Sequence, residues 1–512
     1  MKLKRILAVA LVALFGFVVV GCGKNDTPTD NPTNVPTEAP TPTDTAPTGK
    51  LVVWVGSESS AFYQEKLNAY ASEKKLPFTF DVQGVDTGAA AATFLTDPEA
   101  GADIFTIAHD NFGKLLDGSG VIAPVTKKAL VDQMENNTSL AFLNACYLQA
   151  GDGSEPQYYG VPIISQALVL YYNKSAFAGQ EEKLKTWEGI MEVAKAKGSN
   201  VLATSFMGTD GYNFSNFLLA QPKSKNAIDT FGVQGTLKIY QNTIQANCFN
   251  WGDDQIAIMK YAQRFVCDPN GRGGLLTSNG GYAPELSAGT TLTLIGGSWA
   301  KGTVISSLGA DNWGVVELPS FTLTEADAYG TAKAGMEFYN GTFADCKCLV
   351  KKKGSKFAAY LDDILLYLSS NEMQRESFVK CDNLPASSDV KCVVTADDLK
   401  ANANEDDKRT DAEFERDAKL NSALATAQVA SGKHGIAQPF GFKTKYNSYY
   451  YSAGAPDLYV AIVQNTDNKY STDAAIKETL QTASYIWAKG KNPDTTTAAG
   501  LELWNSWIAK TE

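Results

Sequence analysis

Residues 50–55 read KLVVWV, a short apolar run that opens the folded part of the chain. Residues 60–74 follow with apolar side chains at helical spacing, and residues 78–82 form a second apolar run. A helical stretch at 89–95 and the sequence ADIFTI at 102–107 complete the series. Strand, helix, strand, helix, strand is the pattern of a parallel sheet covered by helices. The sequence therefore predicts an α/β protein.

The same alternation continues toward the C-terminus. We expect helices at 186–196, 357–368 and 476–488, and strands at 201–206, 292–295 and 344–351. Thr186 is expected to cap its helix, because a threonine hydroxyl can accept a hydrogen bond from the first turn. Residues 402–419 are highly charged and are expected to form a solvated helix or loop.

The first 49 residues are of a different kind. A short basic segment and an apolar run ending in Gly21 predict a secretory signal peptide over residues 1–21. Its end resembles a bacterial lipoprotein signal, in which Cys22 would carry the lipid; an ordinary signal peptide or a short anchor is the alternative. Residues 22–49 are rich in Thr, Pro and Asp and have too few apolar side chains to fold. At ~3.1 Å per residue the segment 25–49 of this stalk would reach roughly 75 Å. We therefore expect an extracytoplasmic protein, held at the outer face of the cell membrane by a lipid on Cys22.

The composition argues against several classes of function. The 512 residues carry a formal net charge of −11, whereas a nucleic-acid-binding protein needs a basic surface. The two histidines, His109 and His434, lie in no recognisable catalytic motif. The motifs of α/β-hydrolases, zinc proteases and phosphate-binding loops do not occur either. We expect a protein that is not an enzyme and that has no cofactor and no nucleic-acid partner.

Seven cysteines remain besides Cys22, so at least one thiol is unpaired in a monomer. Cys346 and Cys348 stand two residues apart, which raises the alternative of a metal site. No histidine is nearby in the sequence and no second pair has zinc spacing, so we interpret them as two buried strand thiols and expect no metal. Cys248 and Cys267 would close a loop of about 20 residues, and a bridge there would be worth on the order of 3 kcal/mol.

The order of several short motifs resembles that of a single family. Residues 50–55 are similar to the first strand of maltose-type extracellular solute-binding proteins of bacterial ABC importers. Residues 102–113 and 120–124 resemble the sugar-contacting loop of that family and the turn that follows. Further similar stretches are the first lobe crossing at 160–174, and later core segments at 289–300 (GTTLTLIGGSWA) and 313–319 (WGVVELP).

This resemblance implies an α/β, two-lobe, periplasmic-binding-protein-like fold of type II. Each lobe would be a mostly parallel sheet flanked by helices, with the ligand in the cleft between them. The N-terminal lobe would comprise residues 50–163 and 320–398, and the C-terminal lobe residues 164–319 and 399–512. The resemblance also implies a monomer that captures maltose, maltodextrin or a related oligosaccharide and delivers it to ABC permease subunits. Residues 249–282 look like an insertion.

The family's sugar contacts carry over to individual positions. Asp110 falls on an acidic sugar ligand with His109 beside it, and Trp299 falls on an aromatic residue that stacks on a sugar ring. Glu58 falls near an acidic ligand of the first loop, and Gln166 stands where the maltose binders use a glutamate. The chemistry is consistent, because aromatic faces pack on the ring while carboxylates and amides bind its hydroxyls.

Other positions depart from the family pattern. Asn111 replaces an arginine, and Ile107 replaces an aromatic residue that packs on sugar. A tyrosine that the family pattern places one position later is found at Tyr212. An aromatic residue of the family's cleft aligns with Ala455, and Tyr450 and its neighbours are close enough in the sequence to replace it. The resemblance therefore supports the fold of the family more strongly than it supports maltose as the ligand.

Alternatives remain open at the level of residues and of function. Trp299 could be a core residue, and Asp110 could cap a helix that begins near Phe112. A membrane-tethered glycoside hydrolase would need two paired carboxylates, for which Asp110 and Glu58 are the candidates. A sensor that presents its ligand state to a membrane kinase would use the same closed form as an importer.

Overall fold

The computed structural model describes residues 46–116, 120–148, 154–206, 215–224, 252–267, 271–276, 282–403, 406–437, 455–489 and 491–511. Pro47–Glu512 cluster as one compact unit. The expected signal peptide, Cys22, Tyr212, Cys248 and Tyr450 lie outside the described residues. No helix within the described part of the chain is both long enough and apolar enough to cross a membrane.

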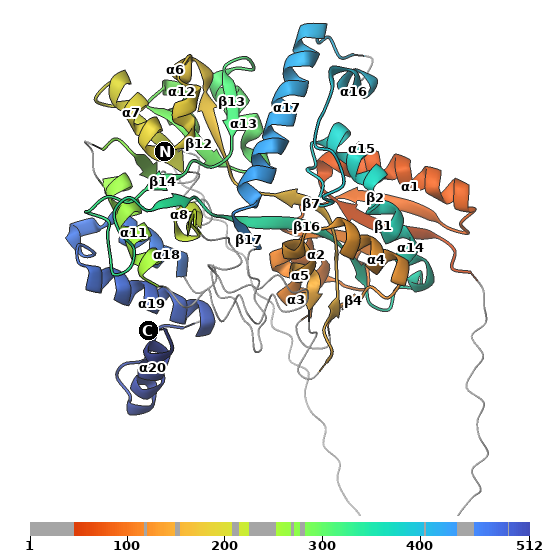
Figure 1. Ribbon diagram of the computed structural model, residues 1–512. Helices are drawn as coiled ribbons and strands as arrows, with labels where there is room; N and C mark the ends of the chain where they lie inside the picture. The colour runs from red at the N-terminus through yellow and green to blue at the C-terminus, as the bar shows by residue number, and fades with distance from the viewer. Residues whose placement is uncertain are drawn as a thin grey trace, which may run out of the picture. The chain divides into compact units, whose positions relative to one another are not determined.

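The first sheet begins as the sequence predicts. Strands β1 (Lys50–Val55), β2 (Thr79–Gly84) and β3 (Ile104–Ala108) are parallel, and helices α1 (Ser60–Lys74) and α2 (Ala90–Thr96) connect them. The strand order is β17-β16-β3-β1-β2, with β4 and β7 also paired to β16. Figure 1 labels β1, β2, β4, β7, β16 and β17 of this sheet. All five residues of β3 are buried, which is why its sequence is an unbroken apolar run rather than an alternating one.

The longest strand, β16 (Thr342–Lys352), organises the rest of this sheet. It runs antiparallel to β3, to β4 (Ile122–Ala123) and to β7 (Val161–Gln166), and parallel to β17 (Gly435–Ala437). Successive side chains of a strand point to opposite faces. Asp345 and Lys347 accordingly lie on one face of β16, while Cys346 and Cys348 lie on the other.

The second sheet has the order β11-β9-β12-β8-β13. Its strands are β8 (Val169–Asn173), β9 (Leu202–Phe206), β11 (Gly274–Leu276), β12 (Thr291–Gly296) and β13 (Trp313–Val316). Strand β12 is parallel to β9 but antiparallel to β8, and all six of its residues are buried. The α/β class is therefore confirmed, with both sheets mixing parallel and antiparallel pairs.

The two sheets are joined directly at one point. Strand β7 of the first sheet ends at Gln166, and β8 of the second sheet begins at Val169. The chain thus passes from one sheet to the other without a helix between these strands. The chain returns to the first sheet with β16 and again with β17.

Helices cover the sheets, and two small sheets complete the fold. β5 (Tyr147–Leu148) pairs with β6 (Gln157–Tyr158), and β10 (Gln221–Pro222), β15 (Glu337–Tyr339) and β14 (Phe321–Thr322) form a three-stranded sheet. The remaining helices of four residues or more in the described ranges are α3 (Phe112–Leu116), α4 (Lys128–Asn137), α5 (Leu140–Cys146), α6 (Lys174–Phe177), α7 (Trp187–Lys197), α8 (Ser215–Leu218), α11 (Asp253–Cys267), α12 (Tyr282–Ala288), α13 (Lys301–Leu308), α14 (Ala358–Leu368), α15 (Asn371–Cys381), α16 (Ala396–Ala401), α17 (Asp411–Gly432), α18 (Ala455–Gln464), α19 (Asp473–Lys489) and α20 (Ala498–Thr511), with a 3-10 turn at Glu181–Lys185.

Candidate functional site

The carboxyl end of β3 carries a buried ionic group. The short 3-10 helix η2 (His109–Asn111) follows the strand, and β16 runs antiparallel beside it. His109 Nδ1 lies 2.7 Å from Asp345 Oδ1, and Lys347 Nζ donates to Asp345 Oδ2 at 2.7 Å. The His109 side chain is fully buried, and Asp345 is only 7% exposed. Asp345 thus has a cationic or hydrogen-bonding partner on each oxygen.

The partners decide the charge state of this group. Burial by itself would raise the pKa of Asp345, but the Lys347 ammonium and the His109 contact outweigh burial and hold that pKa below its usual range. Burial would likewise lower the pKa of Lys347, but the Asp345 carboxylate outweighs it and the pKa is raised. The site is therefore built around a stable ion pair.

Asp110 lies beside this pair, but its pKa is shifted in the opposite direction from that of Asp345. Burial, and then the nearby Asp345 charge, raise the pKa of Asp110, while His109 and Lys347 oppose the rise. Asn111 Nδ2 donates to Asp110 Oδ1 at 3.0 Å, and Lys114 Nζ donates to Asn111 Oδ1 at 2.7 Å. Asn111, which is 4% exposed, therefore orients the Asp110 carboxyl from the inside.

Trp299 comes from the second sheet. Strand β12 ends at Gly296, and the 3-10 helix η4 (Ser298–Ala300) follows it. The indole folds back over Gly297, where a Cβ would collide with its six-membered ring, so this position needs glycine. The Tyr171 hydroxyl donates to the Gly297 carbonyl at 2.9 Å and fixes the turn. Trp299 is 45% exposed, which rules out the alternative of a core tryptophan.

Gln166 brings the two sets of residues together. It is the last residue of β7 and lies opposite Asp345 in the pairing of β7 with β16. Its Nε2 lies 3.4 Å from the hydroxyl of Ser298, the residue that precedes Trp299. A polar side chain at the end of the first sheet thus contacts the turn that presents the indole in the second.

Glu58 lies in the 3-10 helix η1 (Ser57–Ser59), at the same sheet edge as η2, because β1 and β3 are parallel neighbours. Its side chain is exposed and folds against Gly56. Asn383 Nδ2 donates to Ser59 Oγ at 3.0 Å, so the turn after α15 adjoins η1. Glu58 therefore stands at the rim of the group rather than inside it.

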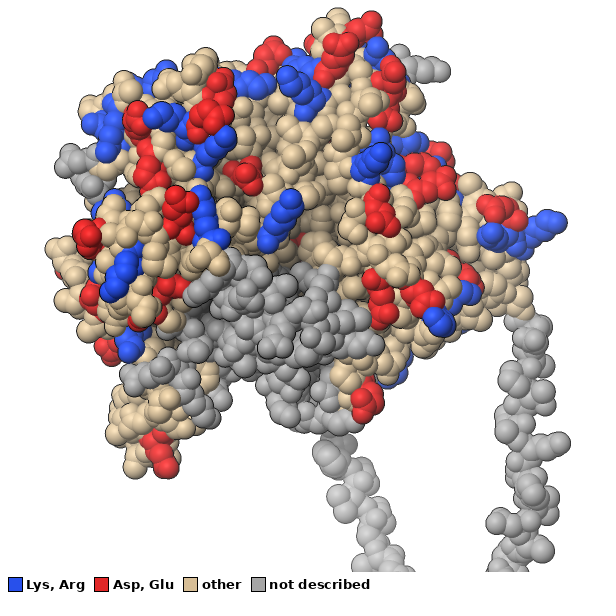
Figure 2. Space-filling view, in the orientation of Figure 1, with Lys and Arg blue, Asp and Glu red and all other residues tan. Residues whose placement is uncertain are grey.

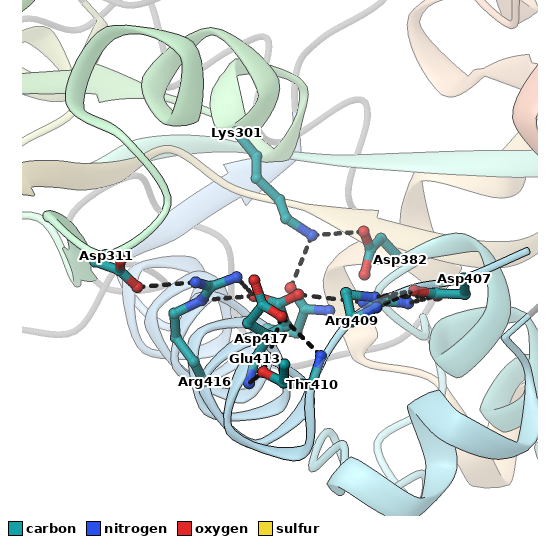
Figure 3. A network of polar contacts seen from close by, with 10 residues as sticks. Lys301, Asp311, Asp382, Asp407, Arg409, Thr410, Glu413, Arg416 and Asp417 are labelled. Atoms are coloured by element: carbon teal, nitrogen blue, oxygen red, sulfur yellow. Dashed lines mark hydrogen bonds and ion pairs between the residues drawn. The ribbon is translucent and has the colours of Figure 1, made fainter.

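A second polar link joins the two sheets near η1. Lys301, two residues after Trp299, contacts Asp382 Oδ2 at 2.6 Å and Asn421 Oδ1 at 2.7 Å (Figure 3). Asp382 ends α15 with a left-handed backbone (φ 57°), and Asn421 belongs to α17. Helix α17 packs mainly on β13 and β8 of the second sheet, whereas α15 packs against α1 beside the first sheet. The Asp382 contact is therefore the one that ties the start of α13 to the first sheet.

Several of these residues were missed from the sequence. Asp345, Lys347 and Lys301 were not among the candidates, although Asp345 and Lys347 organise the buried end of the site. The available signal was the alternation of charged residues with cysteines in an otherwise apolar strand. That signal identifies a polar face but not its partner, because Asp345 lies 236 positions from His109 in the sequence.

A separate cavity of about 580 Å³ lies next to Gln166. It is lined by residues of the β7 end, of the turn after α15 and of α17, with Phe142, Pro385 and Val429 among them. Asp110, Glu58 and Trp299 are not part of this lining. Gln166 itself is part of the lining, but the lining contains no carboxylate, and Phe142 is its one aromatic side chain. We therefore do not assign the ligand to this cavity alone.

Charge on the surface is mixed rather than gathered. Figure 2 shows acidic and basic side chains interspersed over the face in view, although the net charge is −11. The described part of that face therefore offers no broad single-sign field for a charged polymer.

Two helix-flanked mixed sheets, joined by direct strand-to-strand crossings and with polar loops at the joined strand ends, define a two-lobe binding protein. The family model described as bacterial extracellular solute-binding protein matches residues 66–404. The chain belongs to this family. No curated protein matches the sequence.

Solved structures support the same fold. The chain is similar to a maltodextrin-binding protein from L. casei BL23 without ligand, with a TM-score of 0.61 and 18% identity over 86% of this chain and 99% of the other. It is similar to a maltose-binding protein from Listeria monocytogenes in complex with maltose (TM-score 0.56, 16% identity, 85% and 97% covered). A solute-binding protein from Staphylococcus aureus in complex with maltose is similar at the same TM-score and identity, with 85% and 97% covered. At these identities the likeness establishes the fold.

Proposed function

We propose that the protein binds a carbohydrate outside the cell, an oligosaccharide of the maltodextrin type, and delivers it to the permease of an ABC importer. Membership of the extracellular solute-binding family supports the extracytoplasmic role. The maltose held by two of the structural neighbours supports the ligand class. The lobe bounds predicted from the sequence, 50–163 with 320–398 and 164–319 with 399–512, are kept here as a proposal with two changes. β17 (Gly435–Ala437) pairs with β16 and therefore belongs to the first lobe, and β14 and β15 pair with β10 (Gln221–Pro222) and therefore belong to the second. The protein acts as a monomer.

The contact between Gln166 and Ser298 is the observation that carries the proposal. It brings the polar end of the first sheet to the turn that presents the exposed indole of Trp299. Trp299 stacks on a pyranose ring, while Asp110, Gln166 and Glu58 bind its hydroxyl groups. A ligand held from both lobes stabilises the closed form more than the open one, and only such a difference can drive closure.

Hydrolysis of the sugar is less well supported. The raised pKa of Asp110 and the lowered pKa of Asp345 resemble the split between an acid and its partner in a glycosidase. However, both oxygens of Asp345 are engaged and the side chain is buried, so it has no free face for a sugar carbon. We therefore assign binding without catalysis.

Calorimetric titration of a maltodextrin series tests the site. Trp299→Ala should weaken binding by about 2–4 kcal/mol, because it removes the largest apolar contact of the ligand. Leu503→Ala is the matched control, since Leu503 is 46% exposed and Trp299 45%, and it should leave affinity unchanged. Unaltered binding by Trp299→Ala would refute the assignment, and release of shorter sugars in the titration cell would favour the hydrolase.

The anchor and the importer are tested together in cells. Cys22→Ala should leave the precursor unprocessed or release the protein to the medium, because lipid holds the mature protein on the membrane, and uptake of labelled maltodextrin should fall while any released protein keeps its affinity. A variant that stays on the membrane with a cleaved N-terminus would contradict the lipoprotein assignment. Undiminished uptake by cells that lack the protein altogether would favour the sensor over the importer.

A further inference from the structure

Three cysteine side chains meet behind the site, on the opposite face of β16. Cys346 and Cys348 point away from Asp345 and Lys347, and Cys146, the last residue of α5, packs against them. The Sγ atoms of Cys146 and Cys348 lie 3.4 Å apart, and those of Cys346 and Cys348 lie 3.5 Å apart. All three side chains are fully buried. The expectation of buried strand thiols is confirmed, but the third thiol changes their chemistry.

Three sulfur atoms in mutual contact can act together as metal ligands, which a single packed cysteine cannot do. A lone buried cysteine behaves as a small apolar side chain with a weak S–H donor. Here all three sulfurs lie within 4.8 Å of one another, and they come from two elements 202 positions apart in the sequence. Such a grouping is the donor set that soft cations prefer.

The spacing fits a metal ion. With two edges of 3.4 and 3.5 Å and a third of at most 4.8 Å, a point equidistant from the three sulfurs lies about 2.0–2.4 Å from each, whereas zinc–thiolate bonds are about 2.3 Å. The sulfurs would move by a few tenths of an ångström or not at all. The site is therefore preorganised for three thiolate ligands.

The donor set also selects among metals. Zinc sites in proteins are almost always four-coordinate, and the three buried thiols are the only ligand group of this kind within the described residues. The Asp345 carboxylate, the nearest charged oxygen along the strand, is on the other face of β16 and is engaged by His109 and Lys347. Three sulfur donors without a fourth ligand match a soft cation that accepts three-fold coordination, such as Cu(I).

We propose that Cys146, Cys346 and Cys348 form a three-coordinate site for a soft cation of the Cu(I) class. Each thiol that binds the cation releases its proton to solvent. Because each ligand gives up a proton, binding strengthens as the pH rises. The bound cation would pin α5 to β16 directly behind the Asp345 pair.

The full-length protein, reduced and free of oxygen, tests the site. Cu(I) is supplied through a competing chelator, and uptake is followed by loss of the chelator complex and by the thiolate-to-copper absorption band. We expect one Cu(I) per chain, an upward shift in melting temperature, and weaker competition by Zn(II). Cys146→Ala and Cys348→Ala should each abolish the absorption band and the thermal shift. Melting curves without metal show whether each variant folds.

Cys267→Ala is the matched control. Cys267 is exposed, and its thiol donates to the carbonyl of Val463 at 2.9 Å, away from the three. This variant should bind Cu(I) as the unaltered protein does. Absence of binding by the unaltered protein, or full binding by folded Cys146→Ala, would overturn the site. So would a disulfide between two of the three cysteines that, once reduced, leaves a protein unable to take up Cu(I).

Discussion

The Asp345 carboxylate contributes to the stability of the fold and also raises the pKa of Lys347 and of Asp110. It receives Lys347 on one oxygen and His109 on the other, and all three side chains are at most 14% exposed. Removing one partner of a buried ion pair leaves the other charge without compensation. We therefore expect Asp345→Asn to lower the free energy of unfolding by about 3–5 kcal/mol at neutral pH, as measured by urea denaturation.

The same pair predicts a pH dependence with a definite sign. The pKa of Asp345 is lowered in the folded protein, so its stabilisation is complete above the ordinary aspartate pKa of about 4 and is lost as the pH falls below it. The unaltered protein should therefore lose stability more steeply below about pH 4 than Asp345→Asn does. Parallel stability curves for the two proteins in acid would contradict the ion pair.

Asp494 provides the comparison for this prediction. Its pKa is also lowered, by hydrogen bonds from Thr497 and Thr496, but it lies on the surface. Asp494→Asn should cost less stability than Asp345→Asn, because water can solvate the Thr496 and Thr497 groups that lose their carboxylate partner.

At the scale of elements, local signals were sufficient to predict some of the helices and strands, although α4, α11 and α20 were not predicted. Helix α1 begins at Ser60 and ends at Lys74, as its apolar spacing predicts. Thr186 caps α7 by accepting a hydrogen bond from the Gly189 backbone N–H at 3.1 Å. Both features are decided by residues within a few positions of each other, which is why the sequence reveals them.

The pairing of elements could not be predicted in this way. Strand β16 was predicted as a strand, but its three antiparallel neighbours in the first sheet were not. The same limit applies to the site. Asp110 and Trp299 were assigned by the family resemblance of their local motifs, whereas the Asp345 pair and the contact of Cys146 with Cys348 join segments more than 200 positions apart. Such contacts depend on sheet register, which a single sequence does not display.

For the whole molecule, the functional arrangement depends on a few links between the two sheets. The Gln166–Ser298 contact is one, and Lys301 with Asp382 and Asn421 is another. The sequence predicted the family from the order of its motifs, but it did not identify these links, since each joins side chains from distant elements. The departures at Ile107 and Asn111 likewise left the particular sugar open.

The Lys301 link leads to a prediction about affinity. It holds the segment that carries Trp299 next to the turn that adjoins η1 and Glu58, and both residues are proposed to touch one ligand. Lys301→Glu would place a like charge against Asp382 and push the two halves of the site apart. The exposed fractions are 20% for Lys301 and 49% for Asp382, so stability should change by no more than about 1 kcal/mol. Maltodextrin affinity should fall by about fivefold, the equivalent of 1 kcal/mol in binding.

A second substitution distinguishes repulsion from direct loss of a ligand contact. Asp382→Asn removes the negative charge and keeps a residue type that tolerates the left-handed backbone at this position, where φ is 57°. In the double variant with Lys301→Glu the repulsion disappears, so affinity should recover most of the loss. Asp382→Asn alone should bind nearly as well as the unaltered protein. If the double variant binds as weakly as Lys301→Glu, the lysine itself contacts the sugar, and the link between the sheets does not govern affinity.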